Sequence, residues 1–266
     1  MRGRFPGRRR GRATITHEDA GALACLWPNA QPKPPDMTAP ITAISSMATR
    51  EVLAELAQAL QGATGLALHV ESVGGVDAAR RVQGGEAFDL VFLARDALDR
   101  LAAAGAVAAG SQVDLLRSPV AVAVRQGAPR PDISTVAALR AAVEAAESIG
   151  YSTGPSGTFL MQLFAQWGLE ARLQGRTVQA SPGVPVASLV ATGRAALGFQ
   201  QLSELMHAPG IEVLGLLPEP VACITTFSAA RGAQARAALP ELKRVLDFLR
   251  SEVAAAVAHR HGMAPA

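Results

Sequence analysis

The chain of 266 residues is long enough for one large domain or two smaller lobes, and 49% of its residues are apolar, so a sizeable core can form. Its net charge of +3 does not indicate a nucleic-acid-binding fold, because seven of the 25 basic residues lie within the first 36 positions. Two cysteines far apart in the sequence, Cys25 and Cys223, predict neither a disulfide framework nor a metal site. No stretch approaches the roughly 20 apolar residues that a membrane span needs.

Residues 1–37 have an arginine-rich start, "MRGRFPGRRRGR", and a proline-rich end, "PNAQPKPPD", without hydrophobic periodicity. The one apolar stretch, "AGALACLW", is short for a secretory signal and is followed by Pro28. We expect these residues to be a disordered or mis-assigned extension, with the true start at Met37. A basic arm for nucleic acid or a membrane is the alternative. As written, the sequence predicts a cytoplasmic location.

From Ile41 the chain alternates between predicted strands and helices. Strands are predicted at residues 41–45, 66–72, 88–94, 113–127, 148–152, 175–180, 195–201, 211–217 and 221–230. Helices are predicted at residues 49–60, 76–83, 96–105, 135–145, 160–167 and 185–193, with one long helix at 241–260. Such alternation predicts an α/β fold with parallel sheets covered by helices on both faces.

Small or polar residues mark five places where the chain leaves a predicted strand and enters a helix. These junctions are "ISSM" (Ser45, Ser46), "SVGGV" (Ser72, Gly74, Gly75), "STGPSGT" (152–158), "SPGVP" (181–185) and "GFQQLSE" (Gln200, Gln201, Ser203). Ligands of α/β sheets bind outside the carboxyl ends of the strands, where helix N-termini offer unpaired N–H groups. The junctions therefore predict an anion site if the fold brings them together. For any single loop, ordinary helix capping is the alternative.

Four segments resemble the molybdate-type solute-binding proteins, in the same order along the chain. They are "ITAISSMATREVLAELAQAL", "GGVDAARRVQGGEAFDLVFLARDALDRLAAAGAV", "YSTGPSGTFLMQLFAQWGL" and "LVATGRAALGFQQLSEL". The resemblance implies the type 2 periplasmic-binding-protein fold: two α/β lobes with mixed, mostly parallel sheets, joined by two crossover strands. The first lobe would comprise residues 38–120 and, after the chain returns, 216–266; the second would comprise residues 121–215.

The resemblance also implies a function, a solute-binding protein that closes on a small anion between its lobes. By position, the site falls on Ser45 or Ser46, Gly75 or Val76, Ser156, Gly183 or Val184, and Gln201, and the neighbours Gly74, Thr153 and Gly157 complete this set. The expected partners are a small anionic ligand and an ABC-transporter permease, and the protein is expected to be a monomer in the periplasm. No cofactor, metal ion, nucleic acid or membrane span is expected.

Two features of the chain favour a carboxylate ligand over molybdate. Gln201 stands where the molybdate binders carry a tyrosine. Arg80 and Arg81 follow the "VGGV" loop by about one helical turn, and arginine pairs bidentately with carboxylates. Because adjacent helical residues point about 100° apart, at most one of the two arginines faces the cleft. The ligand thus stays open between an oxyanion and a di- or tricarboxylate.

The segments "GGVDAARRV", "GFQQLSEL" and "LGLLPEPV…TTFSAA" resemble a branch of this fold that includes aconitate isomerase. That resemblance implies an alternative function, an allylic proton shift on a tricarboxylate in the same cleft, which needs a base beside the bound acid. Glu204 is the candidate base; Glu71 and Tyr151 also adjoin the site loops, and the histidines are poorly placed. Whether the protein is an enzyme is therefore left open at this point, with the binding protein as the favoured interpretation.

Overall fold

The structure is a computed structural model and describes residues 39–266. The predicted N-terminal extension, residues 1–37, lies outside the described residues. Within 39–266 no helix is both long and apolar enough to cross a bilayer.

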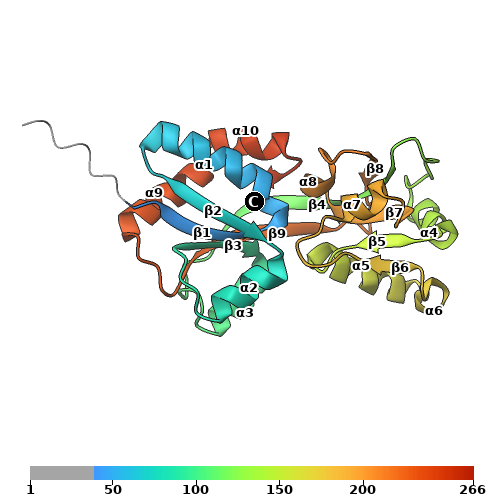
Figure 1. Cartoon of the computed structure of the whole chain (residues 1–266), viewed down its shortest axis with the longest axis horizontal. Coiled ribbons are helices and arrows are strands. Elements are labelled where there is room, and N and C mark those ends of the chain that lie inside the picture. Colours follow the sequence, from blue (N-terminus) through green and yellow to red (C-terminus); the bar gives the residue numbers. More distant parts are fainter. Residues whose placement is uncertain (1–38) are drawn as a thin grey trace, which may run out of the picture. The chain divides into compact units, whose positions relative to one another are not determined.

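A mixed sheet forms the centre of what we call the first lobe (Figure 1). Strand β1 (Ile41–Ser46) lies between β2 (Leu68–Val73) and β3 (Leu90–Ala94), and all three run parallel. The late strand β9 (Ile224–Arg231) joins β3 in the antiparallel sense and also pairs with the start of β4 (Val113–Arg125). The last strand, β10 (Ala264–Pro265), pairs with β4 as well. The first lobe is therefore completed by the C-terminal part of the chain.

Helices cover both faces of this sheet, because each helix has one apolar stripe to bury. On one face lie α1 (Arg50–Thr64), α9 (Leu239–Leu249) and α10 (Glu252–Arg260), which share one hydrophobic core. On the other face lie α2 (Gly75–Gln83) and α3 (Arg95–Ala103), which contribute Ala78, Val82, Leu98 and Leu101 to a second core. A short 3₁₀ turn, η1 (Met47–Thr49), leads from β1 into α1.

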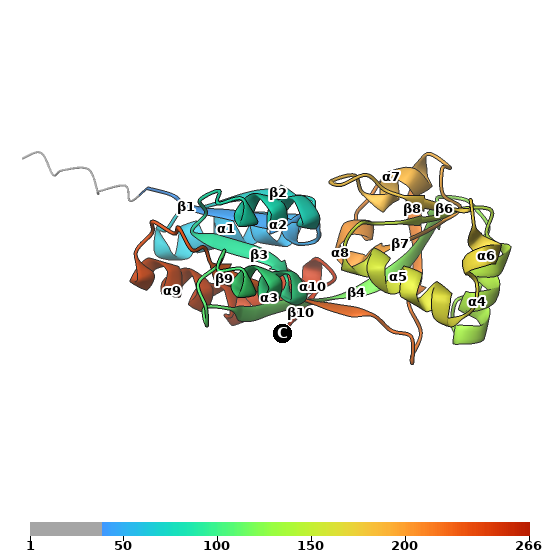
Figure 2. The same ribbon diagram turned by 90° about the horizontal axis from the view of Figure 1, so that it is seen from below.

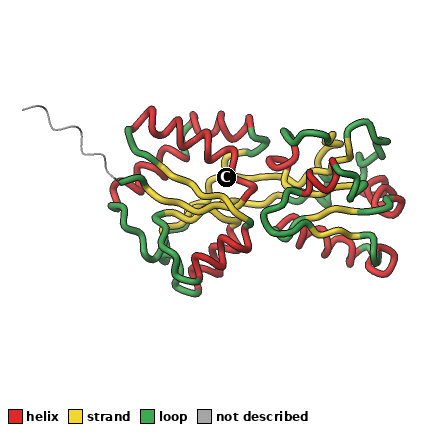
Figure 3. The backbone as a smooth tube through the Cα atoms, in the orientation of Figure 1, coloured by secondary structure: helices red, strands yellow, loops and turns green. Residues whose placement is uncertain are grey.

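The second lobe repeats this layered arrangement around its own strands (Figure 3). Strand β5 (Ile149–Tyr151) runs parallel to β6 (Thr177–Gln179) and β7 (Leu197–Gln201), while β7 and β8 (Ile211–Leu216) are antiparallel to β4. Helices α4 (Val136–Ala145), α5 (Pro155–Gln166) and α6 (Glu170–Leu173) pack on one face. Helices α7 (Val186–Ala191) and α8 (Leu202–Leu205) pack on the other.

Strand β4 belongs to both lobes, as Figure 2 shows. Its residues 113–119 pair with β9 in the first lobe, and its residues 120–125 pair with β7 and β8 in the second. The chain returns from the second lobe through the segment between β8 and β9. The two-lobed α/β architecture with two crossovers is thus as the sequence predicts, while the residue boundaries assigned to the lobes remain a prediction.

The long helix predicted at residues 241–260 is wrong, because the chain forms two helices there. Helix α9 ends at Leu249, and Ser251 adopts an extended backbone conformation with φ −76° and ψ 166°. The Ser251 hydroxyl accepts a hydrogen bond from the Ala254 N–H at 3.3 Å, so it caps a new helix. The mixed sheets implied by the family resemblance are confirmed, with β4, β8, β9 and β10 pairing in the antiparallel sense.

Candidate functional site

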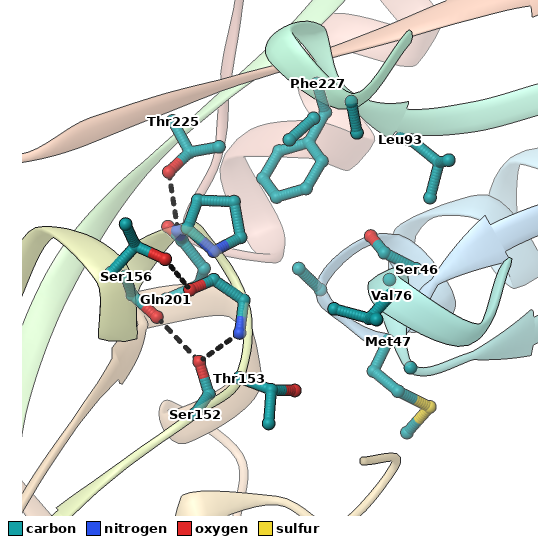
Figure 4. A pocket seen from close by; sticks show the side chains of 18 of the residues that line it. Ser46, Met47, Val76, Leu93, Ser152, Thr153, Ser156, Gln201, Thr225 and Phe227 are labelled. Atoms are coloured by element: carbon teal, nitrogen blue, oxygen red, sulfur yellow. Dashed lines mark hydrogen bonds between the residues drawn. The ribbon is translucent and has the colours of Figure 1, made fainter. Parts of the chain in front are cut away.

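A cleft of about 790 Å³ lies between the lobes and collects residues from all five predicted junctions. Figure 4 shows Ser46, Met47 and Val76 of the first lobe across from Ser152, Thr153, Ser156 and Gln201 of the second. The junction residues that line the cleft are Ser46, Gly74, Gly75, Val76, Ser152, Thr153, Gly154, Pro155, Ser156, Thr158, Ser181, Gly183, Val184, Pro185, Gln200, Gln201 and Glu204. The carboxyl ends of the strands therefore meet at one place, as the strand-to-helix junctions predict.

Two buried polar atoms in the cleft lack a hydrogen-bond partner among the described residues. They are the hydroxyl oxygen of Ser46 and Oε1 of Gln201, whose residues are 7% and 2% exposed. The amide nitrogen of Gln201 donates to the Thr225 hydroxyl at 2.7 Å, which holds the side chain in place. Because an unpaired buried polar atom costs roughly 1–3 kcal/mol, both atoms favour a ligand with polar groups at this point.

The first turn of α5 supplies a hydroxyl to the same cleft. Ser156 is 2% exposed, and its hydroxyl lies 3.1 Å from that of Ser152, which in turn accepts the Gly154 N–H at 3.2 Å. The N–H groups of Gly157 and Thr158 instead donate to the Gly154 carbonyl, each at 3.1 Å. These two N–H groups are therefore engaged within the helix, whereas the hydroxyl of Ser156 can contact a ligand.

Two residues of the predicted ligand set lie outside the cleft lining. Ser45 points to the opposite side of β1 from Ser46, and its hydroxyl lies 2.7 Å from that of Ser72. Gly157 packs its Cα against the preceding loop, where an added Cβ would lie 1.8 Å from the Ser152 carbonyl oxygen. The first residue thus supports the β1–β2 pairing, and the second allows α5 to approach its own loop.

The structure separates the roles of the two adjacent arginines. Arg80 lines the cleft, is 76% exposed at its side chain, and pairs with Asp77 one turn earlier at 2.9 Å. Arg81 points away from the cleft and pairs with Glu71 and Glu86, each at 2.5 Å. The Arg81 hydrogen bonds lower the pKa of both carboxyl groups. Arg80 is therefore the arginine of the pair that can meet a ligand.

Helix α3 adds two cations that the sequence reasoning missed. Arg95 and Arg100 both line the cleft, and Arg95 also pairs with Asp114. Their junction, "FLARD", has the same position at the carboxyl end of a strand as the five junctions above, but it lacks Ser, Thr or Gly. The position of this segment at the end of a predicted strand is the one signal in the sequence that could have placed it at the cleft. By contrast, Thr225 and Phe227 reach the cleft from antiparallel β9, where no strand-to-helix junction exists.

Glu204, at the start of α8, is the acidic residue with the most perturbed ionisation in the cleft. Burial of its carboxyl group raises the pKa to about 7, although a hydrogen bond from Gln200 and the charge of Arg50 act in the opposite direction. The Gln200 amide nitrogen donates to Glu204 Oε1 at 2.6 Å. A carboxyl group with a pKa near neutrality can both accept and return a proton at physiological pH.

The other titratable residues considered from the sequence lie away from the cleft lining. Glu71 is occupied by Arg81, and Tyr151 is half-buried beside Gly157. His207 and His261 face each other edge to face at 6.2 Å between ring centres, and His261 lies 2.8 Å from Glu55. Among the described residues, no group of three or more His, Cys, Asp or Glu side chains could hold a metal ion.

The fold and the cleft are those of the two-lobed solute-binding proteins. Residues 41–264 match the family described as bacterial extracellular solute-binding protein, and the chain belongs to that family. An aconitate isomerase from a Pseudomonas species is 38% identical over 232 residues, which cover 85% of this chain and 87% of that protein.

Solved structures confirm the type 2 periplasmic-binding-protein fold. The periplasmic molybdate-binding protein of Azotobacter vinelandii is similar with a TM-score of 0.69 and 19% identity, covering 84% of this chain and 98% of the other. The sulfate-binding protein SubI of Mycobacterium tuberculosis has a TM-score of 0.68 and 17% identity, covering 86% and 87%. At such identities the likeness concerns the fold alone.

Proposed function

We propose that the protein binds a di- or tricarboxylate between its lobes and interconverts double-bond isomers of it by an allylic proton shift, as aconitate isomerase does. The observation that carries this proposal is Glu204, a carboxyl group with a pKa near 7 in the cleft that holds the unpaired polar atoms of Ser46 and Gln201. The 38% identity to aconitate isomerase supports the same reaction.

The distribution of charge in the cleft suits a ligand with more than one carboxylate. The neutral donors near Ser46 and Ser156 can hold one carboxylate without a cation, as helix N-termini and hydroxyls do. Arg80 and Arg100 can pair with a second one at the side of the first lobe. A volume of about 790 Å³ leaves room for these groups to be several ångströms apart. A single compact oxyanion would leave the arginines unused.

The reaction needs one group that removes a proton and returns it. The Glu204 carboxylate takes a proton from the methylene carbon of the ligand, and the electron pair of that C–H bond spreads over three carbons and the adjacent carboxylate. Glu204, now a carboxylic acid, returns the proton to the former vinylic carbon, and the double bond moves. Hydroxyl and amide donors around the adjacent carboxylate stabilise the charge that develops there.

The test is a comparison of turnover and binding in two variants. With cis- or trans-aconitate, the ultraviolet absorbance of the wild-type protein should drift toward the equilibrium mixture. Glu204→Gln should abolish this drift while calorimetry still detects binding. Glu71→Gln, which removes the other sequence candidate outside the cleft lining, should keep the activity. Wild-type protein that binds aconitate without changing its absorbance would overturn the proposal.

A solute-binding protein without chemistry is the second candidate, and membership of the extracellular solute-binding family favours it. In that case the protein would work outside the cytoplasm as a monomer and deliver its anion to an ABC-transporter permease. Calorimetry against aconitate, citrate, molybdate and sulfate separates the two. Saturable binding of one of these anions without chemical change would support a transport function. Turnover of aconitate would support the isomerase function.

A further inference from the structure

We infer that Gln200 is a positioning residue: it holds one carboxylate oxygen of Glu204 and leaves the other oxygen free for the proton transfer. This inference rests on the proposed function, in which Glu204 is the base. Gln200 is 2% exposed at the end of β7 and lies between the first residue of α7 and the first turn of α8. The side chain thus connects three elements of the second lobe.

The orientation of the Gln200 amide follows from its two partners. The backbone N–H of Val186 can only donate, and it lies 2.8 Å from Gln200 Oε1. The oxygen of the amide must therefore face Val186, and its NH₂ group must face the other way. That NH₂ group lies 2.6 Å from Glu204 Oε1. A flipped amide would place a donor against the donor of Val186, so the orientation is determined by hydrogen bonding.

The consequence for Glu204 is a distinction between its two oxygens. Oε1 accepts the Gln200 N–H in either protonation state, because the carbonyl oxygen of a protonated carboxyl group is still an acceptor. Oε2 accepts no hydrogen bond from the described residues, and Glu204 lines the cleft. The proton is therefore taken up and released at Oε2. Without Gln200 the carboxyl group can rotate and exchange its oxygens.

The same hydrogen bond affects ionisation, together with the other groups near Glu204. The Gln200 N–H favours the carboxylate and lowers the pKa of Glu204, as does the charge of Arg50 at the start of α1. Cys223 also lines the cleft, but burial raises the pKa of its thiol to about 11, so it stays neutral near pH 7. Loss of the Gln200 donor must then raise the pKa of Glu204.

Two substitutions separate this positioning from the capping of α7. Gln200→Glu keeps an oxygen that can accept from Val186, yet it loses the donor and places a second carboxyl group beside Glu204. Gln200→Met has a similar length and removes both hydrogen bonds. We expect Gln200→Met to lower the melting temperature. In both variants we expect the pKa of Glu204 to rise. In Gln200→Glu the two neighbouring carboxyl groups titrate together in two coupled steps, and the upper step should lie above the pKa of Glu204 in the wild type.

The measurement is a ¹³C NMR titration of the full chain labelled at glutamate carboxyl carbons, with the Glu204 signal assigned from its absence in Glu204→Gln. Kinetics with aconitate form the second readout. The acidic limb of the pH profile of kcat should move upward in both variants with little change in KM. A rise of one unit from about 7 leaves roughly fivefold less carboxylate at pH 7. A purely structural Gln200 would change the melting temperature alone.

The titration distinguishes failure of this inference from failure of the proposed reaction. An unshifted Glu204 signal in both variants would overturn the role of Gln200, whatever the activity. A wild-type protein without isomerisation would overturn the reaction, yet an upward shift of the Glu204 titration would still show that Gln200 holds this carboxyl group.

Discussion

Gly74 of the first lobe and Gly183 of the second approach each other so closely that a Cβ added to Gly74 would lie 3.0 Å from the Gly183 nitrogen. Both residues line the cleft, at the junctions before α2 and α7. The backbones of the two lobes therefore meet at one margin of the cleft, and a methyl group on Gly74 would hold them apart, whereas one on Gly183 would lie at an ordinary 4.0 Å from the Gly74 nitrogen. The absence of a side chain at position 74 is a requirement of this contact.

We predict that Gly74→Ala weakens ligand binding by about 1–3 kcal/mol, the usual cost of an inserted methyl group in a packed contact. Its φ of −56° suits alanine, so the unliganded protein should keep its melting temperature. Calorimetry with aconitate measures the effect. Gly62→Ala in α1, where an added Cβ meets nothing within 4 Å, is the control. Equal affinities of the two variants would show that the lobes need not approach so closely.

Arg80 and Arg81 form a matched pair of the same charge on one helix. We predict that Arg80→Ala weakens carboxylate binding by ~1.5–3 kcal/mol, since it removes a charged hydrogen-bond donor from the cleft. Arg81→Ala should leave affinity unchanged, because its partners are Glu71 and Glu86. Thermal shifts in citrate and aconitate, with molybdate and sulfate for comparison, provide the measurement. Equal losses of affinity in both variants would mean that binding depends on the overall positive charge of the helix and not on a direct contact of Arg80 with the ligand.

Ser156→Ala should separate ligand binding from helix capping. We expect affinity to fall by ~1–3 kcal/mol with little loss of stability, because the buried hydroxyl bonds only to Ser152 in the described structure. Thr135→Ala is the contrasting variant: its hydroxyl accepts the Ala138 N–H at 3.1 Å and caps α4. That change should cost ~1 kcal/mol of folding stability and leave binding intact. The opposite pattern would identify Ser156 as a cap.

Glu204 gives stability a specific dependence on pH. Its pKa rises from 4.5 to about 7 on folding, so the native state binds the proton more tightly than the unfolded state. This contribution is complete below pH 4.5 and is lost as the pH rises to about 7. Glu204→Gln should therefore be more stable than the wild type at pH 8, by an amount on the order of 3 kcal/mol, with no such gain at pH 4. Denaturant unfolding at both pH values measures this. A constant difference between the proteins would contradict the raised pKa.

The sequence was informative about the fold because apolar periodicity depends on local geometry. Strands β1 to β9 and most helices lie within a few residues of their predicted positions. The helix break at Arg250 and Ser251 was missed, since both flanking segments carry a compatible apolar stripe and a single serine does not end a helix by itself. The residues alone did not show which strands pair in the antiparallel sense, because pairing depends on contacts between distant segments, and the mixed sheet was expected only from the family resemblance.

The candidate site was predictable where it follows from strand direction and not where it depends on side-chain environment. The junction rule placed Ser46, Ser156 and Gln201 in one cleft. The junction rule could not say which of the two adjacent arginines faces the cleft, because an error of one residue in the predicted orientation of the helix exchanges Arg80 and Arg81. It also gave no sign of the raised pKa of Glu204, which arises from burial of the carboxyl group in the folded structure.

The path of β4 through both lobes has a consequence for the order of folding. The second lobe draws all its strands from residues 113–216, a continuous stretch. The first lobe needs β9, which lies between β3 and β4, and also β10 at Ala264–Pro265. On the ribosome the second lobe therefore has all its strands while the first still lacks β9. One edge of β3 must stay unpaired until residues 224–231 have emerged, late in synthesis.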